Sequence, residues 1–93
     1  MREEELEALE QIRNLVDQGQ YRLTVHFRQR LARRGVFWHD IIGILDEPDQ
    51  VRGDGVDDDG DERWFISGRT DEGAAEFLVV VDAHAKFVTI YWS

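Results

Sequence analysis

Residues 75–81, AEFLVVV, and residues 86–92, KFVTIYW, have the pattern of two β-strands in this 93-residue chain. Both stretches are rich in the β-branched and aromatic residues that favour strands, and the first is apolar enough to be a central strand. Four residues of hairpin length, DAHA (82–85), connect them. The pattern therefore predicts that these two stretches pair as a β-hairpin, with residues 75–81 as a central strand of the sheet.

Two more candidate strands precede this hairpin. Residues 50–56 have weak strand character and are followed by the polar connection DDDGD (57–61). Residues 63–69 have stronger strand character and are followed by TDEG (70–73). Such short connections join neighbouring antiparallel strands. We expect an antiparallel meander of three or four strands.

The first half of the chain has helical periodicity instead. Residues 2–18 place apolar side chains on one helical stripe, and residues 39–46 do the same before Pro48 forbids continuation. Between them, residues 21–25 alternate polar and apolar side chains as a short strand does. We expect residues 1–19 to form an amphipathic helix that covers the core.

These elements follow one another in the order α-β-α-α-β-β-β-β. We predict an α+β fold in which N-terminal helices pack on one face of an antiparallel sheet of three to five strands. The length suits one domain, residues 1–93, made of the cover helix (1–19) and an α+β core (20–93).

A helix whose side chains could carry chemistry is predicted at HFRQRLARRG, residues 26–35. Thr24 is the predicted N-cap, and Gly35 suits the left-handed position that ends a helix. Phe27 and Leu31 face the core, whereas the side chains spaced i, i+4 and i+7 share an adjoining face. That face carries His26, Arg30 and Arg33.

Charge is distributed unevenly along the chain, whose formal net charge is −9. Residues 20–45 contain five arginines against Asp40 alone, whereas residues 46–62 contain nine acidic residues against Arg52 alone. Net charge bears on solubility, but a local cluster bears on a site. The basic block is therefore the favoured functional surface.

Imidazole can transfer a proton near neutral pH, and guanidinium groups can hold a phosphate. These are the parts needed to cleave RNA without a metal, by attack of the ribose 2′-hydroxyl on the adjacent phosphorus. Arg63, Arg69 and Tyr91 are candidates to join from the sheet. In the alternative interpretation, His26 caps the helix and its arginines pair with the acidic run 54–62.

Other chemistries find no support in the pattern. The chain has no cysteine, and its three histidines lack the spacing of a zinc site. An EF-hand beginning at Asp57 fails because Glu62 and Gly68 stand where the motif needs Gly and Glu. No glycine-rich phosphate loop or GxSxG motif is present, and we expect no metal or cofactor. Without a signal peptide or an apolar run of membrane-spanning length, we expect a cytoplasmic protein and no membrane partner.

Four motifs in order, HFRQRLARRGV, DIIGILDEPDQV, RWFISGR and EFLVVVDAHAKFVTIYW, resemble a small bacterial family of domains of unknown function, DUF4258. Its pattern is HxxxRxxxRGI, a PDxV turn and a closing VxTxYW strand, and the resemblance extends from about Tyr21 to Trp92. That family is similar to the RelE and BrnT ribonuclease toxins, whose fold is two helices packed on an antiparallel sheet.

The resemblance implies a metal-independent messenger-RNA interferase, or an RNA-binding relative, that acts as the toxin of a type II toxin–antitoxin pair. It implies proton transfer by His26, phosphate contacts by Arg30 and Arg63, and a hydroxyl or stacking contact by Tyr91. We expect further RNA contacts from a set of four arginines: Arg28, Arg33, Arg34 and Arg69. The implied partners are RNA, either free or on the ribosome, and an antitoxin that resembles the MqsA or YgiT type.

Two other functions remain open from the sequence. The basic helix would bind a protein partner if the domain were a non-catalytic interaction module. Alternatively, the acidic residues 46–62 would imitate a nucleic acid and occupy the basic groove of another protein.

Overall fold

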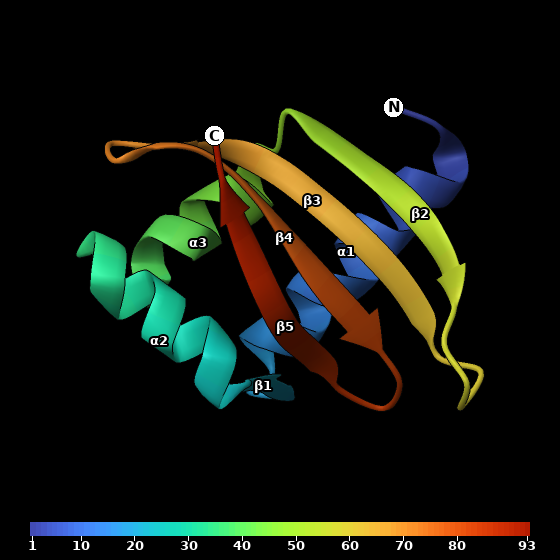
Figure 1. Ribbon diagram of the computed structural model, residues 1–93. Coiled ribbons are helices and arrows are strands. Elements are labelled where there is room, and N and C mark those ends of the chain that lie inside the picture. The colour runs from blue at the N-terminus through green and yellow to red at the C-terminus, as the bar shows by residue number, and fades with distance from the viewer.

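The computed structural model describes all residues from 1 to 93 and confirms the predicted α+β class and element order (Figure 1). Four strands pair antiparallel with their neighbours in the chain. They are β2 (Gln50–Val56), β3 (Glu62–Thr70), β4 (Gly73–Val81) and β5 (Ala85–Trp92).

The three helices are α1 (Glu3–Asp17), α2 (Val25–Arg34) and α3 (Trp38–Asp46). Helices α1 and α3 cover one face of the sheet, and α2 lies beside β5 (Figure 1). Arg13 of α1 donates hydrogen bonds to the main-chain carbonyls of Leu45 and Asp46, both at 2.6 Å. It thereby satisfies acceptors that the C-terminus of a helix leaves without intrahelical partners. None of the helices has the length and apolar character that a membrane crossing requires.

The sheet is mixed rather than wholly antiparallel. Strand β1 (Tyr21–Leu23) lies at its edge and pairs in parallel with β5, which gives the order β1-β5-β4-β3-β2. Parallel neighbours need a long connection, and α2, α3 and the meander supply it here. Alternation of polar and apolar residues predicts a strand but carries no information on the direction of its partner.

Aromatic side chains at the centre of the core join α2 to the sheet. Phe27 is fully buried and packs edge-on against Phe77 and Phe87, with ring centroids 6.3 and 5.7 Å away. Trp38 of α3 packs against Phe87 and stacks on Tyr21, with centroids 5.0 Å apart in both pairs. These contacts fix α2 and α3 against the buried face of the sheet.

A β-bulge in β5 decides which side chains of that strand face away from the helices. Phe87 pairs with Val79 but Thr89 pairs with Leu78, so Val88 is an extra residue. Both Phe87 and Ile90 are consequently buried in the core, although unbroken alternation would place them on opposite faces. The bulge turns Thr89 and Tyr91 to the other face of the sheet.

Glycine at position 68 permits α3 to approach β3. A Cβ atom at Gly68 would lie 2.8 Å from Cγ2 of Ile44, whose side chain is 1% exposed. We expect Gly68→Ala to lower the free energy of unfolding by about 1–3 kcal/mol, the usual cost of overpacking. Urea denaturation of the purified protein measures this change.

Gly43, in the middle of α3, provides the matched control. A Cβ atom there would meet nothing within 4 Å, and alanine in a helix interior is favoured over glycine by roughly 0.5–1 kcal/mol. Gly43→Ala should therefore stabilise the protein. Equal effects of the two substitutions would show that α3 does not pack closely on β3.

Candidate nucleic-acid interface

Thr24 anchors the start of α2 to the edge of β5. Its hydroxyl accepts a hydrogen bond from the Phe27 amide at 3.0 Å and donates one to the Val88 carbonyl at 2.7 Å. Its own amide donates to the Phe87 carbonyl at 3.1 Å. Gly35, with φ 66°, ends the helix in the left-handed conformation, so both predicted caps of α2 are confirmed.

This contact places the first two turns of α2 against the C-terminal half of β5. His26 Nε2 lies 3.0 Å from Arg30 Nε and 3.0 Å from Thr89 Oγ1. Arg30 Nη1 donates to the Ile90 carbonyl at 3.1 Å, and its guanidinium carbon lies 5.8 Å from the centre of the Tyr91 ring. We call His26, Arg30, Thr89 and Tyr91 the His26 cluster.

The Arg30 contact fixes the hydrogen-bonding state of the imidazole. A guanidinium nitrogen can only donate, so His26 Nε2 accepts, and the single proton of the neutral ring is assigned to Nδ1. Two of the five guanidinium N–H groups of Arg30 are engaged by His26 and Ile90. The other three remain free to bind an anion.

The arginines of α2 have no carboxylate within 4.0 Å. Arg52 with Glu76, at 3.3 Å, and Arg63 with Asp54, at 3.1 Å, are the ion pairs that arginine forms in the chain. The alternative in which the α2 arginines pair with the acidic run 54–62 is therefore wrong, and Thr24 rather than His26 is the N-cap. The acidic run 54–62 extends from the end of β2 to the start of β3, whereas the His26 cluster lies beside the opposite end of the sheet.

No helix covers the second face of the sheet, which we call the open face. Strand alternation and register assign to it five cations: Arg22, Arg52, Arg63, Arg69 and Lys86. Arg30 reaches the same face from α2 through its contact with Tyr91. Two acidic residues, Asp54 and Glu76, accompany them. This face is thus basic in a chain with a formal charge of −9.

The structure separates two of the predicted sheet residues from the His26 cluster. In the sheet register Tyr91 lies opposite Glu76, and Glu76 lies opposite Ser67. Arg63 is four residues from Ser67, roughly 13 Å along β3, and is therefore far from the row of Tyr91. Arg63 also pairs with Asp54. Arg69 is exposed at the other end of β3. It lies two residues beyond Ser67, so it is nearer than Arg63 to the row of Tyr91.

The remaining predicted RNA contacts lie on α2. Arg28 and Arg33 are exposed, and the Arg34 guanidinium lies 5.0 Å from the centre of the Trp92 ring. A cation over an indole face is attracted by the ring quadrupole. Arg34 therefore supports the end of β5, while Arg28 and Arg33 are free.

Sequence reasoning missed several residues of this surface, namely Arg22, Arg52, Phe65, Thr89 and Lys86. The alternation of Arg63, Phe65, Ser67 and Arg69 along β3 was a usable signal, because side chains two apart share a face. Thr89 had no such signal, because its orientation depends on the bulge at Val88.

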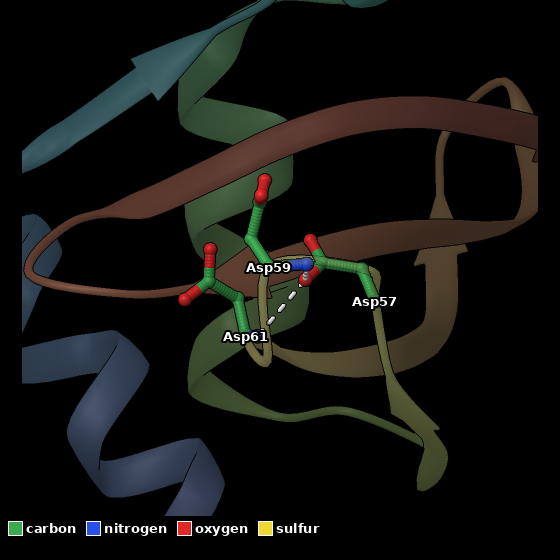
Figure 2. A group of neighbouring side chains, drawn as sticks. All are labelled: Asp57, Asp59 and Asp61. Atoms are coloured by element: carbon green, nitrogen blue, oxygen red, sulfur yellow. Dashed lines mark hydrogen bonds between the residues drawn. The ribbon is translucent and has the colours of Figure 1, made fainter.

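Acidic residues gather in the turn between β2 and β3 (Figure 2). Carboxylate oxygens of Asp57, Asp59 and Asp61 lie within 4.8 Å of one another. Asp57 Oδ1 accepts hydrogen bonds from the amides of Asp59 and Asp61, at 3.0 and 2.9 Å. One of the six oxygens therefore stabilises the turn, and the others have the chemistry to attract a hard cation.

Crowding in this turn perturbs one carboxyl group. Desolvation, together with the carboxylates of Asp57, Asp82 and Asp59, raises the pKa of Asp61, and Lys86 partly opposes the rise. A raised pKa in the folded state means that ionisation destabilises the fold above that pKa. The penalty is absent below the unfolded pKa of about 3.8, grows as the pH rises through the folded value and persists at neutral pH.

We therefore expect Asp61→Asn to raise the urea midpoint at pH 7, and the gain to shrink as the pH approaches 4. Asp58→Asn is the matched control, because this neighbour is exposed and its carboxylate is not one of the three that converge in the turn. A gain for Asp61→Asn that is the same at both pH values would contradict the titration account.

The other two histidines do not contribute to a site with several ligands. The His39 side chain is 80% exposed, 3.6 Å from Asp40, and His84 lies 3.8 Å from Asp82. The three aspartates of the acidic turn are the one group in which three potential metal ligands converge. Comparison of the chain with protein-family models, curated proteins and solved structures gives no match.

Proposed function

We propose that this protein is the toxin of a type II toxin–antitoxin pair, a cytoplasmic endoribonuclease that cleaves RNA with its own side chains. The observation that carries the proposal is the His26 cluster. It joins an imidazole, a guanidinium with three free N–H groups and an aromatic hydroxyl on a basic face. The motif resemblance to DUF4258 and to the RelE and BrnT toxins favours the same function.

Arg30 would hold the scissile phosphate. Its guanidinium is held against β5 by the hydrogen bond from Nη1 to the Ile90 carbonyl and has no carboxylate to neutralise it, so its other donors are available to an anion. Paired donors in a fork match two phosphate oxygens and stabilise the charge that develops in the transition state. Arg28, Arg33 and Arg69 are exposed on the flanks and would contact neighbouring phosphates.

His26 would act as the general base. When Arg30 Nε turns from His26 Nε2 to the phosphate, that nitrogen is free to accept the proton of the ribose 2′-hydroxyl. The 2′-oxygen forms a bond to phosphorus, and the bond from phosphorus to the 5′-oxygen breaks. The Tyr91 hydroxyl gives the leaving oxygen its proton, and the His26 imidazolium restores that proton through solvent. The products carry a 2′,3′-cyclic phosphate and a 5′-hydroxyl.

An antitoxin partner follows from the same resemblance. A protein that neutralises this toxin would cover the open face and α2, where the unpaired cations are. We propose an antitoxin of the MqsA or YgiT type as that partner. Co-purification with the product of the neighbouring gene tests this part of the proposal.

Induced expression in bacteria tests the function as a whole. The wild type should arrest growth, and Arg30→Ala should relieve the arrest, because it removes the phosphate contact. Removal of one charge-stabilising donor typically costs 10²–10³ in rate, which is about 3–4 kcal/mol. Culture density after induction measures the effect, with protein levels checked by immunoblot.

Arg2→Ala is the matched control, since Arg2 is exposed beside acidic α1 and distant in sequence from the cluster. It should leave the arrest unchanged. Normal growth with the wild type at a verified protein level would overturn the toxin proposal and favour the interaction module.

A further inference from the structure

A row of paired side chains crosses the open face from the His26 cluster to the opposite edge of the sheet. The row begins at Thr89 of β5, which His26 contacts. It continues through the register partners Leu78 of β4, Phe65 of β3 and Arg52 of β2. Phe65 is two strands from Thr89, or about 10 Å across the sheet. An aromatic ring therefore lies in the same row as Thr89, the β5 residue that His26 contacts.

The exposed side of Phe65 is covered by a flexible side chain and not by the fold. The Arg52 guanidinium lies 4.3 Å from the centre of the Phe65 ring and 3.3 Å from Glu76 Oε1. The Arg52 and Glu76 side chains are 45% and 34% exposed, so this ion pair is in contact with solvent. Exposed ion pairs contribute little to stability, so a ligand can readily exchange this pair for its own contacts.

The charge of the surface indicates the class of ligand. The open face carries six cations with Arg30 included and two acidic residues, and an aromatic ring lies in the middle of them. Cations that follow a backbone, combined with aromatic rings on which bases stack, form the typical surface for single-stranded nucleic acid. Duplex RNA would keep its bases stacked inside, away from such a ring.

We propose that Phe65 is a stacking platform for a nucleobase of single-stranded RNA, adjacent to the nucleotide whose phosphate Arg30 holds. Arg52 moves off the ring when the base arrives and packs on the opposite side of that base, because guanidinium and aromatic planes both stack on bases. This inference rests on the proposed function and identifies the substrate as unpaired RNA. It also assigns a role to Arg52, which carries no role in the proposed reaction.

Binding of two hexamers tests the platform. One is a 2′-fluoro adenylate hexamer, which lacks the attacking hydroxyl, and the other is an abasic chain with the same number of phosphates. We expect the wild type to bind the base-bearing hexamer at least about fivefold more tightly, since one stacked base contributes about 1–3 kcal/mol. Phe65→Leu should lose that preference by weakening binding of the base-bearing hexamer alone. Fluorescence anisotropy gives both dissociation constants.

Two variants separate stacking from folding. Phe65→Trp keeps an aromatic face and should retain the preference, whereas Phe37→Leu makes the leucine substitution at a phenylalanine that is 65% exposed at the start of α3. Phe37→Leu should behave as the wild type. Thermal unfolding shows whether Phe65→Leu remains folded, and if it does not, the wild-type comparison of the two hexamers decides.

The outcomes distinguish the two proposals. If the wild type binds both hexamers equally well and Phe65→Leu does the same, the stacking platform is overturned and the ribonuclease proposal stands. If Phe65→Leu weakens both hexamers equally, Phe65 has a structural role and the platform is again overturned. If the wild type binds neither hexamer, both proposals fail.

Discussion

Replacing His26 with alanine is expected to slow RNA cleavage by about 10²–10⁴-fold, the typical contribution of a positioned proton-transfer group. RNA affinity should change little, because Arg30 keeps its Ile90 contact and its free donors. Single-turnover cleavage of end-labelled RNA by purified protein measures the rate, and anisotropy measures the affinity. The residual products should still carry 2′,3′-cyclic phosphate ends.

His39 offers the matched control, because its side chain is 80% exposed on α3, outside the His26 cluster. His39→Ala should cleave at the wild-type rate. Cleavage by His26→Ala at the wild-type rate would contradict the assignment of the base. Loss of affinity without loss of rate in bound RNA would make His26 a binding residue instead.

Replacing Phe27 with alanine should produce the largest loss of stability, about 3–5 kcal/mol. The side chain is fully buried and touches Phe77 and Phe87, so its removal leaves a cavity between α2 and the sheet. For a domain of this size, 1 kcal/mol lowers Tm by roughly 4–8 °C. Differential scanning calorimetry should therefore show a decrease in Tm of at least about 12 °C.

Phe37→Ala makes the same chemical change on the surface, where the side chain is 65% exposed. It should stay within about 0.5 kcal/mol of the wild type. Because Phe27 also holds the helix that carries His26 and Arg30, its loss should impair RNA binding even below the new Tm. Equal stabilities for the two alanine variants would mean that α2 does not pack as described.

Local signals along the chain predicted the elements of this fold well. Thr24 and Gly35 delimited α2, Pro48 ended α3, and the apolar run 75–81 became the central strand β4. Each of these signals acts within a few residues through capping, ring closure or burial. The parallel pairing of β1 with β5 joins segments more than 60 residues apart, so no local sequence signal predicts it.

The candidate site was predictable only in its helical part. The spacing of His26 and Arg30 placed them together, and the structure adds Thr89 and Tyr91 from β5. Tyr91 reaches the open face through the bulge at Val88, and simple alternation from Lys86 would place it with the core residues. The sequence also suggested that Arg63 joins His26. In the structure Arg63 pairs with Asp54 at the N-terminal end of β3, away from the His26 cluster.

RNA binding by α2 and the open face can be observed residue by residue in an NMR titration of the labelled protein with a short single-stranded RNA. We predict chemical-shift changes concentrated on His26, Arg30, Thr89 and Tyr91 and extending to Phe65, with the amides of α1 unchanged. Changes confined to α1 or to the acidic turn, or no changes with RNA in large excess, would mean that α2 and the open face do not bind RNA.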